Sequence, residues 1–254
     1  MPTPKLQFAG FAPEHADDCP MPDNDSPNDC FGPERNTFPP LEKNAEEVNY
    51  VSKLLGGNAY SGPEVTETLF HKTSRYASIL HFAMHGFLND CDPLYSGLVF
   101  SEDDFSLDDG FLYTYEIYNL DLQADLAVLS ACNSGYGELR KGEGIMSLAR
   151  AFRFAGCANV LMSLWLAEDA ATENIMKTFY QCLDIGDGKS DALRKAKLNY
   201  LSESAGNHPA FWAGFLMVGD NLPVKKKFPW IHILFAVLIA GFGLGILRKI
   251  RARF

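Results

Sequence analysis

Five short apolar runs, separated by turn residues and helical patterns, constrain the fold of this chain more than any other feature of its sequence. They cover residues 77–84, 97–100, 126–130, 160–165 and 215–218. Continuous apolar runs of this length are typical of strands buried on both faces, as in a parallel sheet covered by helices. We therefore expect each run to form a strand.

Helical patterns lie before and between these runs. Apolar residues recur at helical spacing from Ala45 to Leu55, where Gly56-Gly57 provides a stop. Further helices are expected at residues 64–72, 144–155, 169–183 and 190–201. The alternation of strands and helices predicts an α/β sandwich with a mainly parallel sheet.

The two ends of the chain differ from this middle part. Residues 1–37 hold seven Pro and many Asp and Asn, so we interpret them as a disordered, acidic, Pro-rich linker before a domain at 38–222. Residues 228–247 carry no formal charge and are nearly all apolar, which is about the length of a transmembrane helix. Basic clusters flank this run, and they make a buried core helix the weaker alternative.

We therefore interpret residues 223–254 as a single-pass C-terminal membrane anchor that leaves the folded domain in the cytoplasm. The chain carries 22 basic and 32 acidic residues. Seven of the basic residues and no acids follow position 224, so the remainder has a charge of −17. Such a body is expected to repel nucleic acid.

The cysteines and histidines give no sign of a metal or a disulfide framework. Six Cys are scattered without CxxC pairs, and we expect most of them to be free thiols in a reducing compartment. His81 and His85 have the i, i+4 spacing of helical zinc ligands, but HFAMH lacks the Glu of HExxH and fits a strand better. We therefore expect neither a metal site nor a cofactor.

One histidine and one cysteine stand at the ends of two expected strands. The first apolar run leads to His85-Gly86, and the third leads to Cys132. Reacting groups collect at the carboxyl ends of parallel strands, so the two side chains would meet if these strands are neighbours. A thiol needs such a base because the thiolate is the nucleophile. The backbone N–H groups of Gly86 and Cys132 would then stabilise an oxyanion.

Taken separately, each residue has a plainer reading. A Cys after an apolar strand is usually a small buried side chain, which is how we interpret Cys157 and Cys182. A His at a strand end is more often a satisfied polar group than a base. The two readings are about equally supported until a wider resemblance is considered.

The motifs HFAMHGF, GLVF, LSACNSGYGE, GEGIMSLARAFRFAGCANVLMSLW and HPAFWAGFLMVGD closely resemble the CHAT domain, a caspase-like module usually found beside tetratricopeptide repeats. The resemblance covers about residues 38–220. It implies a three-layer caspase-hemoglobinase-like sandwich, with His85-Gly86 as the base motif and Ala131-Cys132 as the nucleophile motif. Met84 stands where the family usually has Thr, and Leu166 stands where Pro is common. These departures concern the shape of the pocket more than the dyad.

The resemblance further implies peptide-bond cleavage through a thioester and activity that awaits a partner, such as a tetratricopeptide-repeat protein. Trp165 and Asp169 are candidates to line the pocket for the residue before the scissile bond, although Asp169 is as well placed to cap a helix. Two alternatives remain. One is a catalytically silent interaction module at a membrane, and the other is a different Cys-His acyl-transfer enzyme.

Overall fold

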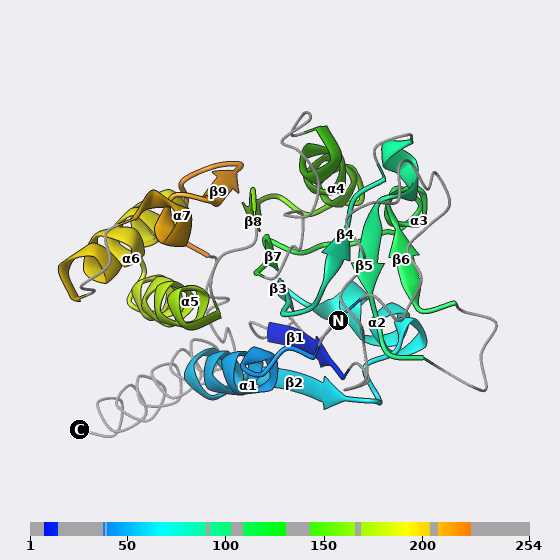
Figure 1. Ribbon diagram of the computed structural model, residues 1–254, viewed down its shortest axis with the longest axis horizontal. Helices are drawn as coiled ribbons and strands as arrows, with labels where there is room; N and C mark the ends of the chain where they lie inside the picture. Colours follow the sequence, from blue (N-terminus) through cyan, green and yellow to red (C-terminus); the bar gives the residue numbers. More distant parts are fainter. Residues whose placement is uncertain are drawn as a thin grey trace, which may run out of the picture. The chain divides into compact units, whose positions relative to one another are not determined.

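A six-stranded sheet with helices on both faces forms the centre of the described chain (Figure 1). The computed structural model describes residues 8–14, 38, 40–89, 92–102, 109–130, 143–165, 169–203 and 208–224. In order across the sheet, its strands are β2 (Gly57–Gly62), β1 (Phe8–Pro13), β3 (Ile79–Phe82), β7 (Leu126–Leu129), β8 (Val160–Ser163) and β9 (Phe215–Val218). All neighbouring pairs among them are parallel except β8 and β9, which are antiparallel.

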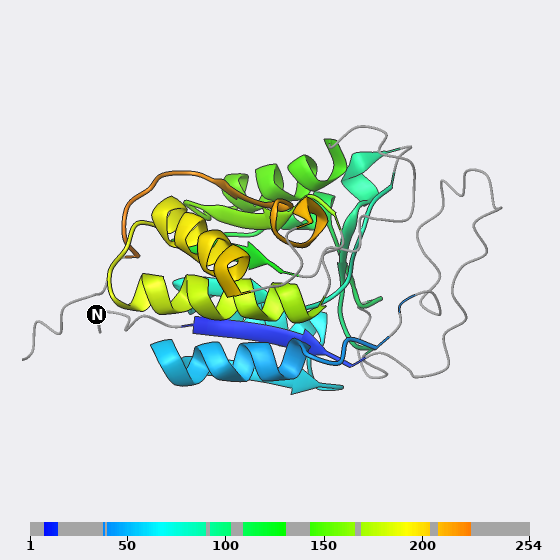
Figure 2. The same cartoon turned by 60° about the vertical axis from the view of Figure 1, so that its left-hand side comes forward.

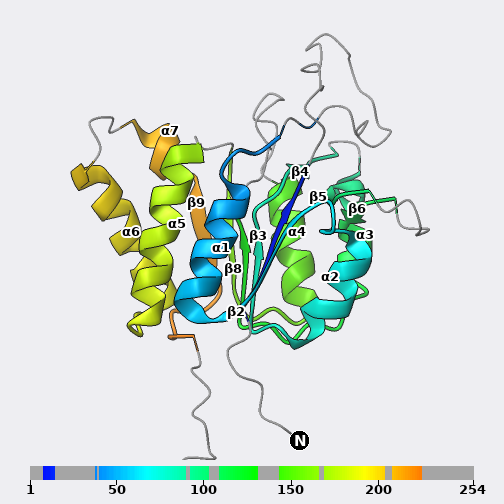
Figure 3. The same cartoon turned by 90° about the horizontal axis from the view of Figure 1, so that it is seen from below.

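Two helical layers cover this sheet, and Figure 3 shows them on its opposite sides. One layer contains α1 (Asn44–Leu55), α5 (Asp169–Asp184), α6 (Lys189–Glu203) and the short α7 (Pro209–Trp212). The other contains α2 (Glu67–Thr73), α3 (Thr114–Ile117) and α4 (Glu143–Phe154). The prediction of a mixed α/β fold with a mainly parallel sheet is confirmed.

A small antiparallel sheet lies on the second side. It is formed by β4 (Gly86–Phe87), β5 (Gly97–Val99) and β6 (Phe111–Tyr113). The 3-10 turns η2 (Ser74–Tyr76) and η3 (Pro93–Tyr95) precede β3 and β5. The third apolar run of the sequence is thus part of the main sheet, whereas the second run, at 97–100, forms a strand of this separate sheet. The sequence did not distinguish these two cases because both strands are buried.

The interpretation of residues 1–37 as a linker was wrong for Phe8–Pro13. All six residues of β1 are buried, and the strand lies between β2 and β3. Its few aromatic and small residues were hidden in the average composition of a segment rich in Pro and Asp. Of that segment, residues 1–7 and 15–37 lie outside the described residues.

The end of α1 explains a second strand that the sequence did not indicate. The helix ends at Leu55 as expected, and Gly56 caps it with a φ of 77°. Gly57 then enters β2 with a φ of 116°, and a side chain there would lie 2.4 Å from the carbonyl oxygen of Phe8. The second glycine is therefore required for the pairing of β2 with β1, in addition to stopping the helix.

The expected membrane anchor lies outside the part of the chain that the structure describes. Residues 225–254 are not among the described residues. Within the ranges described, no helix is both long and apolar enough to cross a bilayer.

Candidate active site

The strands that lead to His85 and Cys132 are direct neighbours. Strands β3 and β7 pair in parallel, and Phe82 at the end of β3 lies opposite Leu129 at the end of β7. His85 is three residues beyond Phe82, and Cys132 is three residues beyond Leu129. The condition on which the dyad depends, that these strands lie side by side, is confirmed. Cys132 itself lies outside the described residues, so the dyad remains a prediction.

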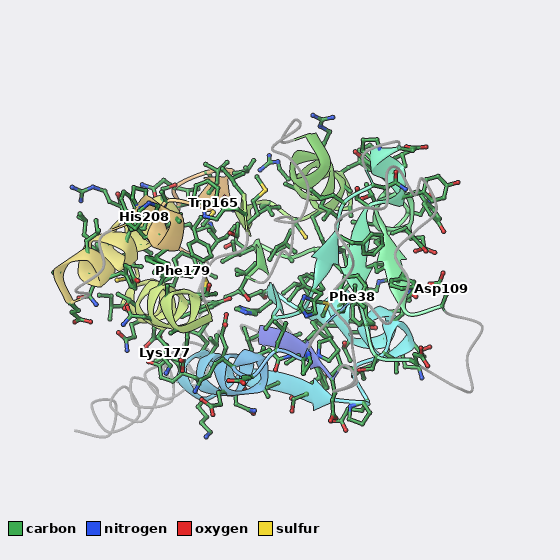
Figure 4. All side chains as sticks on the ribbon, in the orientation of Figure 1. Phe38, Asp109, Trp165, Lys177, Phe179 and His208 are labelled. Atoms are coloured by element: carbon green, nitrogen blue, oxygen red, sulfur yellow. The ribbon has the colours of Figure 1, made fainter. Side chains whose placement is uncertain are left out.

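His85 is held between the main sheet and the small sheet. Its carbonyl oxygen accepts a hydrogen bond from Val99 N of β5 at 2.9 Å. Its ring lies 5.4 Å from the ring of Phe38, at an interplanar angle of 34°, and the residue is only 2% exposed. Figure 4 shows Phe38 beside the small sheet. The imidazole is thus screened from solvent, with the Phe38 ring among the groups that lie against it.

Gly86 begins β4, immediately after the histidine. It pairs with Leu98 of β5, and the bond from Val99 N to the carbonyl of His85 identifies this as a non-hydrogen-bonded antiparallel pair. The N–H of Gly86 therefore points away from β5. This direction is compatible with the expected role of Gly86 as an oxyanion donor.

Trp165 emerges from the same edge of the sheet, two residues after β8. Its indole N–H donates to the carbonyl oxygen of Ala210 in α7 at 2.7 Å, and Figure 4 shows it beside His208 at the start of that helix. A side chain at Gly214 would lie 2.9 Å from the indole, so only glycine allows this close packing. Trp165 is thus a fixed group at the edge of the sheet.

Asp169, the other expected pocket residue, is the first residue of α5. Its side chain and residues 166–168 lie outside the described part of the chain. The choice between a pocket group and a helix cap therefore stays open.

The two cysteines that the structure describes are poor nucleophiles. Cys157 is buried, and burial raises the pKa of its thiol to about 12. Partial burial and then the nearby charge of Asp187 raise the pKa of the Cys182 thiol. The interpretation of Cys157 as a buried residue is confirmed, whereas Cys182 is half-buried on α5.

The sequence did not predict a buried polar cluster behind the two strand ends. His81 of β3 is fully buried, with Nδ1 2.6 Å from Tyr180 Oη and Nε2 3.1 Å from Ser130 Oγ. Glu47 Oε1 of α1 lies 2.8 Å from the same Nε2. The segment is a strand, as expected, so the helical spacing of zinc ligands does not apply to His81 and His85. We call Glu47, His81, Ser130 and Tyr180 the buried polar cluster.

Comparison with protein families matches residues 20–220 to the family described as CHAT domain. Among curated proteins, Tetratricopeptide repeat protein 28 from Homo sapiens is 28% identical over 218 residues, and the protein of the same name from Mus musculus is 27% identical. Each alignment covers 74% of this chain but only 9% of the relative. The chain therefore corresponds to a small part of these longer proteins.

Among solved structures, the chain is similar to the Arg specific cysteine proteinase gingipain R, with a TM-score of 0.54 and 12% identity. The match covers 87% of this chain and 48% of the proteinase. The complex of the Porphyromonas gingivalis RgpB pro- and mature domains matches with a TM-score of 0.52, again at 12% identity, covering 87% of this chain and 49% of that one. At 12% identity, these similarities show a shared fold and nothing more. That fold is caspase-like.

Proposed function

Because the chain belongs to the CHAT domain family, we propose that it is a cysteine peptidase in which Cys132 is the nucleophile and His85 is the base. The observation that carries the proposal is the parallel pairing of β3 with β7. This pairing ends at Phe82 and Leu129, and the two residues of the dyad follow at equal distance along the chain. The caspase-like fold supports the same reading, since cysteine proteinases share it.

The proposed reaction proceeds in two halves. His85 takes the proton of the Cys132 thiol, and the thiolate attacks the carbonyl carbon of the peptide bond. The N–H groups of Gly86 and Cys132 would stabilise the oxyanion. His85 then protonates the leaving amine as the C–N bond breaks, which leaves a thioester. Water, deprotonated by His85, attacks the thioester and releases the acid, and the proton returns to the thiolate.

We further propose that the substrate is a peptide or protein whose residue before the scissile bond packs against Trp165. The fixed position of this indole, between Ala210 and Gly214, supports its use as a wall of the pocket. An acidic side chain at Asp169 would suit a basic residue in that pocket. Gingipain R, which shares the fold, is an Arg specific proteinase, and this agrees with that preference.

Activation by a partner is part of the proposal. His85 is 2% exposed and lies against Phe38, so access to it requires a rearrangement. A tetratricopeptide-repeat protein is a reasonable partner, because the curated relatives carry that name and are far longer than this chain. We also propose that residues 228–247 anchor the chain in a membrane with the catalytic domain in the cytoplasm, on the length of this run and its flanking basic residues.

The burial of His85 also favours the second candidate, a catalytically silent CHAT module that recruits partners at a membrane. A fold kept only for interaction would need no access to the imidazole. The two candidates differ in the reactivity of Cys132.

A peptide-based, thiol-directed probe separates these candidates. In lysate of cells that express the full chain, with all cellular partners present, we expect the probe to label Cys132. His85→Ala is expected to abolish the labelling, whereas Cys182→Ala, which removes a half-buried thiol of raised pKa, leaves it unchanged. Absence of labelling at Cys132 under these conditions would refute the peptidase proposal. Analysis of the cleaved peptide products then separates a peptidase from another acyl-transfer enzyme.

A further inference from the structure

The buried polar cluster joins one helical layer to the main sheet at one point. Glu47 comes from α1, His81 from β3, Tyr180 from α5, and Ser130 directly follows β7. All four residues are at most 5% exposed. Figure 2 shows α1 and α5 side by side. Both helices lie on the same face of the main sheet, and Glu47 and Tyr180 come from them. The cluster is therefore buried inside the protein, with almost no contact with solvent.

The charges of the cluster determine where its protons lie. A carboxylate oxygen 2.8 Å from Nε2 of His81 would repel a nitrogen lone pair, so this nitrogen carries a proton. The contact with Glu47 lacks the alignment of a hydrogen bond and is an electrostatic one. The hydrogen-bond geometry is met instead with Ser130 Oγ, at 3.1 Å.

On the other side of the ring, Nδ1 lies 2.6 Å from the hydroxyl of Tyr180. Burial, and then the charge of Glu47, raise the pKa of Tyr180 well above its ordinary value, so its hydroxyl keeps its proton. In the neutral imidazole, Tyr180 donates to Nδ1 and Nε2–H donates to Ser130.

With its oxygen accepting from His81, the hydroxyl of Ser130 donates onward to the carbonyl oxygen of Phe82, at 3.4 Å. The backbone N–H of Ser130 donates to the same carbonyl, at 3.2 Å. Ser130 therefore binds the last residue of β3 twice. The chain of hydrogen bonds ends at the point where both strands leave the sheet.

Stability alone does not account for this arrangement. Burying polar and charged groups costs free energy even when they are paired, and apolar side chains of similar size often serve as well or better. The surrounding cluster of buried residues, among them Phe8, Val51 and Ile79, is apolar. His81 lies four residues before His85, and Ser130 lies two residues before Cys132. These polar groups thus occur where β3 and β7 end.

We propose that Glu47, His81, Ser130 and Tyr180 are positioning residues that fix the ends of β3 and β7, and so hold His85 and Cys132 in register for proton transfer. This inference rests on the proposed peptidase function. The role proposed for them acts through the strand ends and not through contact with the substrate. A small displacement of reacting groups is enough to lower a rate about 100-fold, so loss of this support is expected to reduce turnover and leave substrate binding unchanged.

The test is the pH profile of Cys132 alkylation by iodoacetamide, followed peptide by peptide in the full chain in lysate, with all cellular partners present. In the wild type we expect Cys132 to react well below the pH at which an ordinary thiol ionises, about 8.5, and His85→Ala to abolish this shift. Ser130→Ala, Tyr180→Phe and His81→Gln are expected to lower the rate at pH 7 about tenfold and to move the profile upward. Ser130→Thr keeps the hydroxyl and is expected to restore the rate.

Two control variants distinguish positioning from general stability. Val51→Ala removes packing from the same helix face as Glu47, and His71→Gln disrupts a second His–Glu pair of the described residues, at 3.3 Å on α2. Both are expected to keep the wild-type profile. If folded Tyr180→Phe and Ser130→Ala also keep it while His85→Ala does not, the inference is overturned and the peptidase proposal stands. If His85→Ala leaves the wild-type profile unchanged, both fail together.

Discussion

Both faces of the main sheet pack apolar side chains, but one of them also holds the buried polar cluster, and β3 shows the contrast within four residues. Leu80 and Phe82 belong to one buried cluster, in which the ring of Phe82 stacks on Phe11 at 5.6 Å and lies 5.2 Å from Phe152. Ile79 lies on the opposite face, where His81 is surrounded by the buried polar cluster. Alternation along the strand separates the two sets.

One strand thus serves two purposes. The aromatic face supplies packing, which depends on volume and shape. The face with the polar cluster supplies direction, because hydrogen bonds and charges fix orientations that packing alone leaves loose. Variants on the first face should therefore change stability, and variants in the polar cluster should change the order of the active site.

The largest expected effect belongs to the aromatic face. Phe11 is fully buried and contacts the rings of Tyr60, Phe70, Phe82 and Phe100. Phe11→Ala is expected to lower the free energy of unfolding by about 3 to 5 kcal/mol, measured by denaturant titration. The alkylation profile of Cys132 in the folded protein should not change. A loss of less than about 1 kcal/mol would show that this face is not tightly packed.

The next effect comes from breaking the polar cluster on one side. His81→Leu leaves the carboxylate of Glu47, which is 5% exposed, without the Nε2–H dipole of the imidazole beside it. We expect a loss of about 3 kcal/mol in the free energy of unfolding, since an uncompensated buried charge is costly. The comparison variant His71→Leu leaves an equally buried carboxylate, that of Glu67, but should cost less than His81→Leu because the His71 side chain is 41% exposed, so that water can reach the place it leaves. Equal losses in the two variants would remove the distinction between these pairs.

Removing both partners of the pair separates its contribution to stability from its contribution to the active site. The double variant Glu47→Leu with His81→Leu replaces the pair by apolar groups, so we expect its free energy of unfolding to return to within about 1 kcal/mol of the wild type. Its Cys132 alkylation rate at pH 7 should nevertheless stay low. A double variant with wild-type reactivity would mean that the polar cluster contributes only to stability.

The smallest effect at neutral pH is expected at Cys157, which belongs to the aromatic-face cluster. Burial raises the pKa of its thiol from 9.0 to about 12, so the folded state keeps this proton where the unfolded state loses it. The resulting stability is fully present below pH 9 and is lost as the pH rises toward 12. Denaturation curves from pH 7 to 11 should therefore fall less steeply with pH for Cys157→Ala than for the wild type. Identical slopes would contradict the assigned burial.

The sequence was sufficient for the elements that carry a clear periodic signal. The runs that became β3, β7 and β8 and the helices α1, α4, α5 and α6 were expected close to their observed bounds. The pattern also placed His85 and Cys132 just after two expected strands, whereas the pairing of these strands as direct neighbours came from the structure.

The features that the sequence did not predict depend on long-range contacts, which leave no local pattern in the sequence. Strand β4 has two residues and β6 has three, too few for a periodic signal. The buried polar cluster joins His81 to Tyr180, 99 residues away, and each of these residues taken alone has an ordinary local context. His81 drew attention only through its spacing from His85, and that spacing suggested a metal rather than Tyr180 or Glu47.

An N-terminal proteomic comparison of cells expressing the full wild-type chain, Cys132→Ala or His85→Ala tests the catalytic dyad directly. Peptidase activity predicts a set of new protein N-termini in the wild type that both variants lack, and the residues before the cleaved bonds would report the preference of the pocket at Trp165. The same set of N-termini in all three samples, at equal expression, would contradict the assignment of Cys132 and His85 as a catalytic dyad.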